Sequence, residues 1–184
     1  VFFRFNSPAA GIWKIVIEPI TVTDGQFHMW LPVTEFIDGE VYFLESDPYY
    51  TLTNPANTQS PVVVSYYNGT TNAVFKHQAE DIHDPVRSKP DLTAPGINIR
   101  GPVSNGRFET HSGSCAACAV TAGAVALMLE WLLYIQKAPG IDSFQIRSLL
   151  ILGALRPDTM EYPNRIWGYG QLNLYHTFEV MRKL

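Results

Sequence analysis

The sequence predicts an α/β domain with a buried parallel sheet, preceded by a smaller unit of antiparallel β-strands. Residues 116–131 are apolar on every side of a helix, which places that helix inside a core. Residues 61–68 form a short β-branched and aromatic run, typical of a parallel strand covered on both faces. Residues 1–32 instead alternate at period two, which indicates strands with one buried face. We therefore expect two parts, residues 1–42 and 43–184.

The first part is predicted to contain three antiparallel strands. The breaks at Ser7-Pro8 and Asp24-Gly25 are typical of turns, and they separate three alternating runs. The apolar positions of these runs are Phe3, Phe5, Trp13, Ile15, Ile17, Phe27, Met29 and Leu31. We expect Trp13, Phe27 and Trp30 to lie in the core of this unit. A sugar-binding aromatic face is the alternative.

The second part opens with irregular chain and then two expected strands. The first strand, within 61–68, lies between Pro61 and an Asn-Gly pair. The second lies within 91–99, and the turn Ala94-Pro95-Gly96 sets its end. Residues 101–109 predict a loop that contains a tight turn at Asn105-Gly106.

Between these two strands, residues 75–88 are strongly polar. The stretch contains the potential metal ligands His77, Glu80, Asp81, His83 and Asp84. A metal site is one interpretation of this group. A solvated polar loop is the other, and it is the one that we favour.

The apolar run at 116–131 predicts the central helix of the domain. Ser112 and Ser114 are candidate N-caps because their hydroxyls can accept hydrogen bonds from the first free N–H groups. Gly123 lies inside the helix, where glycine costs about 1 kcal/mol relative to alanine. We therefore expect a packing reason for Gly123.

Cys115 falls in the first turn of this helix. Free backbone N–H groups and the helix dipole favour negative charge there, so a thiol at this position is expected to react more readily than an ordinary buried one. The same N–H groups can stabilise an oxyanion on a substrate. The alternative is structural, because a free cysteine often packs as a small apolar side chain.

Cys115 and Cys118 also form a CxxC pair, which at a helix start is a thiol–disulfide signature. The surrounding residues are not of a redox type. A zinc site needs more ligands than this pair and the nearby His111 supply. We therefore predict no metal and no cofactor.

Two further helices are expected after the central one. Residues 141–155 carry apolar side chains at three- and four-residue spacing, and Asp142 or Ser143 is the candidate cap. Residues 172–181 form a terminal helix in which Leu174, Phe178 and Met181 face inward.

Composition excludes several classes of partner. The net charge of −4 argues against nucleic acid and anionic membranes. Polar residues interrupt every stretch of the length that a membrane span needs, so no span is predicted.

The stretch from residue 89 to residue 131 resembles subtilisin-like serine proteases, the subtilases. Lysine, proline and aspartate at 89–91, Ala94-Pro95-Gly96 and Ser112-Gly113 match family motifs, as does the Ala-Gly pair at 122–123. In this alignment Cys115 stands where the family has its nucleophilic serine, and Ser114 replaces a threonine. Ala119, where the family has proline, and the stretch 151–175 resemble the clostridial germination-specific (Csp) branch.

The resemblance implies a subtilisin-like parallel sheet with helices on both faces. It also implies that residues 1–42 are the closing strands and linker of a jelly-roll insert, and that residues 43–184 are the C-terminal part of a peptidase domain. The family's catalytic Asp and His and its oxyanion-hole Asn precede this region. We therefore expect the N-terminal part of the same subtilase, with its prodomain, to be a partner, alongside a protein or peptide substrate.

The resemblance implies endopeptidase activity in which residue 115 is the nucleophile and its backbone N–H lines the oxyanion hole. It also implies a spore-associated or secreted protein with a role in germination. Because Cys115 replaces serine, we expect weak proteolysis by the complete protein and none by this chain alone. The alternative is a pseudoprotease that retains the fold for binding or regulation.

Overall fold

The computed structural model describes residues 2–32, 36–37, 39–47, 49–74 and 89–183. The chain divides into two compact units, Val1–Glu45 and Ser46–Leu184. We describe each unit by itself. The polar stretch at 75–88, with its candidate metal ligands, lies outside the described residues.

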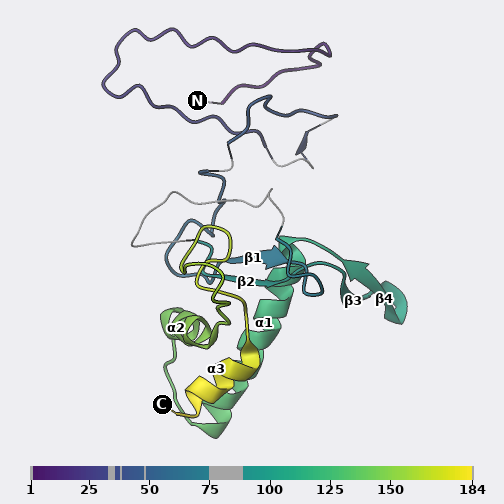
Figure 1. Cartoon of the computed structure of the whole chain (residues 1–184). Coiled ribbons are helices and arrows are strands. Elements are labelled where there is room, and N and C mark those ends of the chain that lie inside the picture. Colours follow the sequence, from purple (N-terminus) through teal and green to yellow (C-terminus); the bar gives the residue numbers. More distant parts are fainter. Residues whose placement is uncertain (1, 33–35, 38, 48, 75–88, 184) are drawn as a thin grey trace. The chain divides into compact units, whose positions relative to one another are not determined.

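The first unit contains neither an α-helix nor a β-strand among its described residues (Figure 1). The three predicted strands are therefore wrong for this structure, and so is the predicted core. Trp13, Phe27 and Trp30 are 58%, 66% and 60% exposed. The physical reason is that an isolated antiparallel ribbon is marginal without further strands or a helix to cover its apolar face. The jelly-roll assignment stays a prediction.

The second unit holds all the named elements. In chain order they are β1 (Val64–Tyr67), β2 (Leu92–Pro95), β3 (Ile99–Val103), the 3₁₀ turn η2 (Ser104–Gly106), β4 (Arg107–His111), α1 (Ser114–Glu130), the π-helical turn η3 (Trp131–Ile135), α2 (Ser143–Gly153) and α3 (Leu174–Met181).

β1 and β2 pair in parallel, which confirms the predicted parallel sheet. Val64 lies opposite Leu92, and Ser65 lies opposite Thr93. On the other side of β2, the Thr93 N–H donates to the carbonyl of Gly170 (3.0 Å), and the Thr93 carbonyl accepts from the N–H of Leu172 (2.9 Å). The segment before α3 therefore extends this sheet.

The predicted loop at 101–109 is instead a β-hairpin. β3 and β4 pair antiparallel, from Ile99 opposite His111 to Val103 opposite Arg107. The tight turn lies at Asn105 and Gly106, as predicted, with φ of 64° and 68°. Positive φ at two adjacent residues is the requirement of a hairpin turn that suits Asn-Gly. In Figure 1 the hairpin projects away from β1 and β2. The loop prediction failed because these strands lack a run of apolar residues.

The core lies between β2 and the three α-helices. Its buried side chains are Leu92, Met128, Leu132, Ile146, Leu150, Ala154 and Met181. The helices predicted at 141–155 and 172–181 are confirmed as α2 and α3. Asp142 caps α2 through a capping box with Gln145. Leu174 and Phe178 pack against this core, as predicted.

α1 and η3 together form a 22-residue helix, Ser114–Ile135, that is long and apolar enough to cross a membrane by length and composition alone. The core helix of a soluble protein passes the same test. One side of this helix packs into the core through Ala117, Thr121, Ala124 and Met128. We therefore interpret it as a core helix. Polar interruptions in the sequence did not by themselves distinguish a core helix from a membrane span.

Candidate active site

The turn that carries Cys115 lies at the carboxyl ends of β1 and β2. The Gly96 N–H donates to the carbonyl of Tyr67, the last residue of β1 (3.0 Å). The Gly113 N–H then donates to the carbonyl of Gly96 (2.7 Å). Two hydrogen bonds therefore connect the end of β1 to the residue just before α1. This is the edge of a parallel sheet at which α/β proteins bind their ligands.

Two glycines make this close approach possible. A Cβ at Gly96 would lie 2.6 Å from the Cβ of Tyr66 and 2.8 Å from the carbonyl oxygen of Gly113. Gly113 has φ of 125°, a conformation that side chains rarely adopt. The Ala94-Pro95-Gly96 motif therefore ends β2 and leaves room for the start of α1.

The predicted N-caps are wrong. Gly113 is the N-cap residue, and among the described residues no side chain caps the first turn of α1. The Ser112 hydroxyl instead accepts from the N–H of Asn98, just before β3 (2.9 Å), and Ser114 is already helical. Serine lost the capping role because the loop after β2 competes for its hydroxyl. Within the part of the chain that the structure describes, the first-turn N–H groups therefore have no side-chain cap and are available to stabilise an oxyanion.

Cys115 is the second residue of α1, with its thiol free and its side chain exposed. Cys118, one turn further on, is also free and exposed. The structural alternative, in which Cys115 packs as a buried apolar side chain, is therefore not what the described chain shows. Among the described residues, no three His, Cys, Asp or Glu side chains gather in a way that could hold a metal ion.

A buried ion pair supports the strand that leads to this turn, and sequence reasoning missed its role. The Asp91 carboxylate accepts from the Lys89 ammonium (2.8 Å) and from the Val63 N–H (2.7 Å). Arg147 of α2 lies 3.9 Å from the other carboxylate oxygen. The sequence signal for this ion pair was the presence of two oppositely charged residues, one on each side of a proline, directly before an apolar strand. The pair fixes the start of β2 against the start of β1.

A pair of hydroxyl side chains further along β1 and β2 adds to this support. The Ser65 and Thr93 hydroxyls lie 2.8 Å from each other and 3.0 and 3.2 Å from the carbonyl of Ile166, so one hydroxyl can donate to the other while the second donates to the carbonyl. Since Ser65 and Thr93 face each other in the register, these bonds hold β1, β2 and the loop before α3 together. The ion pair and the hydroxyl pair therefore hold together the two strands that lead to the turn before Cys115.

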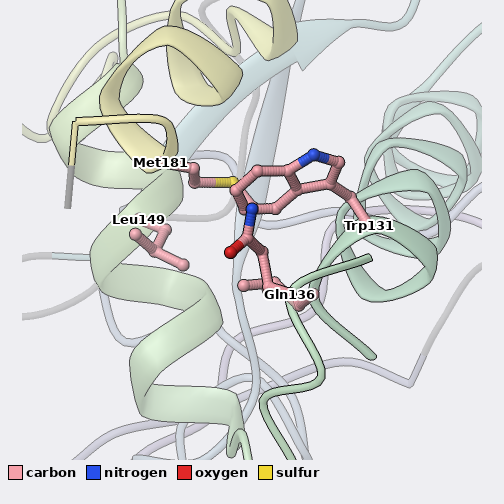
Figure 2. A pocket seen from close by; sticks show the side chains of 5 residues that line it. Trp131, Gln136, Leu149 and Met181 are labelled. Carbon is pink, nitrogen blue, oxygen red and sulfur yellow. The ribbon is translucent and has the colours of Figure 1, made fainter. Parts of the chain in front are cut away.

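An open pocket of about 200 Å³ lies at the other end of the long helix. Figure 2 shows Trp131, Gln136, Leu149 and Met181 converging on it, and Leu132 completes the lining. Trp131 follows Cys115 by sixteen residues, which corresponds to about 24 Å along a helix. The pocket is mostly apolar, and no nucleophile lines it. It is therefore not part of the candidate active site.

Comparisons with known proteins agree with the geometry. The model of the subtilase family of peptidases matches residues 44–170. The solved structure of the Clostridium perfringens CspB protease is 33% identical, covers 77% of this chain and 31% of that chain, and has a TM-score of 0.71. No curated protein matches.

Two solved structures with lower identity share the fold alone. The prenylagaramide maturation protease PagA is 21% identical over 72% of this chain and 46% of that chain, with a TM-score of 0.57. The self-cleaved protease domain of PatA is 20% identical over 74% of this chain and 47% of that chain, with a TM-score of 0.53. The chain thus spans less than half the length of each of these structures.

Proposed function

Because the chain belongs to the subtilase family of peptidases, we propose that it is the nucleophile-bearing part of a domain that hydrolyses peptide bonds in protein substrates. One observation carries the proposal. Cys115 stands exposed in the first turn of α1, at the carboxyl edge of β1 and β2. The sequence resemblance aligns it with the family's nucleophilic serine, which supports the proposal. No described side chain caps the N–H groups of this first turn.

In the proposed reaction the sulfur of Cys115 attacks the carbonyl carbon of the scissile peptide bond. A histidine from the N-terminal part of the protein takes the thiol proton and gives it to the leaving amine, while an aspartate orients the histidine. Water then hydrolyses the thioester on Cys115, which releases the acid product and restores the thiol. The backbone N–H of Cys115, with an asparagine side chain from the same N-terminal part, stabilises the tetrahedral oxyanion.

The N-terminal part of the same protein is the proposed partner. α1 and η3 expose apolar side chains on the side away from the core, namely Leu127, Leu133, Tyr134 and Ile135. Exposed apolar surface of this kind marks an interaction site. The N-terminal part supplies the missing catalytic groups and covers this surface.

The alternative is a pseudoprotease that binds or regulates without hydrolysis. The thiol at residue 115 favours it, because sulfur is larger than oxygen and the thiolate–imidazolium pair changes the balance of protons in a site shaped for serine. The loss of an upstream Asp, His or Asn would have the same effect.

A pair of assays on the full-length protein separates the two functions. We would label thiols with an iodoacetamide probe under reducing conditions and measure casein hydrolysis, for the wild type and for Cys115→Ser. Rapid labelling of Cys115 and hydrolysis by Cys115→Ser are expected for a peptidase with a substituted nucleophile. Cys118→Ser is the matched control, since it removes the other exposed thiol of the same helix. An inert Cys115 together with an inactive Cys115→Ser would leave only the pseudoprotease.

The setting that we propose is spore germination. The resemblance to the clostridial germination-specific branch and the 33% identity with the Clostridium perfringens CspB protease support it. A strain without this gene is then expected to germinate more slowly, measured as the fall in optical density of a spore suspension. Unchanged germination would remove this part of the proposal and leave the peptidase chemistry in place.

A further inference from the structure

Cys115 and Cys118 lie on one side of the first two turns of α1. Residues three apart on a helix are neighbours on its surface. Both thiols are free and both side chains are exposed. The two residues between them, Ala116 and Ala117, are buried against the other side. No bulky side chain therefore separates the two sulfurs.

The spacing suits a disulfide within the helix. In a regular helix the Cα atoms of residues i and i+3 are about 5 Å apart, within the range of about 4.4–6.8 Å that disulfides accept. The Cβ atoms start about 5–6 Å apart and must approach to about 3.5–4.5 Å. The first turn must therefore tighten slightly when the bond forms.

The start of α1 can accommodate this movement. Its N-cap residue is Gly113, and no side-chain hydrogen bond holds the cap in place. Cys115 follows by only two residues, so the adjustment falls in the first turn, where helices have the fewest internal hydrogen bonds.

We propose that Cys115 and Cys118 form a reversible disulfide that removes the nucleophile and switches the site off, with a small-molecule disulfide as the oxidant. The inference rests on the proposed function in one respect. The disulfide regulates activity only if residue 115 is the nucleophile. A metal-binding role for the pair lacks support, because no third ligand gathers with it among the described residues.

The chemistry balances in two exchange steps. The Cys115 thiolate attacks one sulfur of the small disulfide, and the other half leaves as a thiolate that takes up a proton. The Cys118 thiolate then attacks the Cys115 sulfur and releases the second half as a thiol. The protein pair is oxidised by two electrons, and the small disulfide is reduced to two thiols. An added dithiol reverses both steps.

The test uses the full-length protein treated with oxidised glutathione, blocked with iodoacetamide and digested with trypsin. Both cysteines fall in one expected peptide, residues 108–137, because cleavage occurs after Arg107 and Lys137. The wild-type peptide is expected to lose the mass of two hydrogen atoms and to take up no iodoacetamide. Dithiothreitol is expected to restore two labelled thiols.

Cys118→Ser is the matched variant. Its reaction with oxidised glutathione should end at a glutathione adduct on Cys115, because the second thiol is missing. A wild-type peptide that stops at the same adduct, or that is labelled on both cysteines after oxidation, would overturn the proposal. The mass measurement does not depend on proteolysis. Hydrolysis is tested separately with Cys115→Ser, which cannot form the bond, so failure of the switch and failure of the peptidase function give different results.

Discussion

Asp91 is a buried carboxylate that holds together the strands beneath the candidate nucleophile. It is 3% exposed, and it accepts hydrogen bonds from the Lys89 side chain and the Val63 backbone. Removing one partner of a buried ion pair leaves the other charge uncompensated, which costs more than the pair contributes. The pairing of β1 and β2 at their amino ends therefore depends on this single side chain.

We expect Asp91→Ala to lower the free energy of unfolding of the full-length protein by about 3–5 kcal/mol, because the Lys89 charge and the Val63 N–H lose their buried acceptor. Urea titration followed by circular dichroism measures the change. Asp158→Ala, at an exposed position, is the control and should alter stability little. Equal stabilities for the two variants would contradict the role of Asp91.

Tyr67, at the end of β1, gives the fold a dependence on alkaline pH. Its side chain is 7% exposed and packs beside Trp167, with ring centroids 5.4 Å apart. Burial raises the pKa of Tyr67 above its ordinary value, because the phenolate loses its hydration. The unfolded state therefore releases this proton at lower pH than the folded state.

The contribution of Tyr67 to stability is accordingly complete below about pH 10 and is lost as the pH rises from there through the raised pKa. We expect Tyr67→Phe to reduce the fall in unfolding free energy above that pH, measured by urea titration at several alkaline pH values. Tyr175→Phe, which alters an exposed ring, controls for the loss of a hydroxyl. Identical alkaline slopes for the wild type and Tyr67→Phe would show that Tyr67 is not responsible.

At the scale of elements, the start of α1 depends on Gly96 at the end of β2. A methyl group there would meet Tyr66, Gly113 and the Cβ of Ala117 at 2.6, 2.8 and 3.1 Å. The carbonyl of Gly113 is backbone and cannot rotate away. Any side chain at residue 96 therefore displaces the turn that carries Cys115.

We expect Gly96→Ala to lower the free energy of unfolding by about 1–3 kcal/mol, the usual cost of overpacking, and to slow the labelling of Cys115. Gly101→Ala is the matched control, because a Cβ at that β3 position meets its nearest neighbour, His111, at an ordinary 3.8 Å. Stability and labelling that remain at wild-type values in Gly96→Ala would contradict the close approach.

α1 also shows why an apolar sequence does not reveal which face is covered. The sequence predicted burial on most sides, yet the described chain covers one side and leaves Leu127 and the exposed positions around it uncovered. Gly123 has no atom within 4 Å of a Cβ placed on it, so the packing reason expected for it is not found within the described chain. The exposed apolar side chains and the open space at Gly123 are both explained if another part of the protein covers this side of α1.

At the scale of the whole molecule, that explanation yields a test of the proposed partner. Leu127 on α1 is 51% exposed, and Leu152 on α2 is 54% exposed. We expect Leu127→Glu to cause loss of soluble full-length protein, because the N-terminal part would have to bury the new charge against α1. Leu152→Glu is the matched control and should be tolerated. Equal yields, measured after size-exclusion chromatography, would argue that the N-terminal part does not cover this side of α1.

The sequence by itself determined the elements whose signals are local. The parallel pairing of β1 and β2, the capped start of α2, the Asn105-Gly106 turn and the inward face of α3 all follow from spacing, capping chemistry and turn chemistry, and all are confirmed. The subtilase motifs likewise predicted the family, which the match over residues 44–170 confirms. The role of Cys115 as the nucleophile stays a prediction.

Only the tertiary structure decided the features that depend on competition between groups distant in the sequence. Ser112 hydrogen-bonds Asn98 and not the helix start, and the hairpin of β3 and β4 forms where a loop was expected. The ion pair of Lys89 and Asp91 is buried because two strands and α2 enclose it. The strands expected at 1–32 do not form, since an apolar alternation becomes a sheet only where partner strands cover it. Local patterns cannot encode which distant group is nearest, so these features required the folded chain.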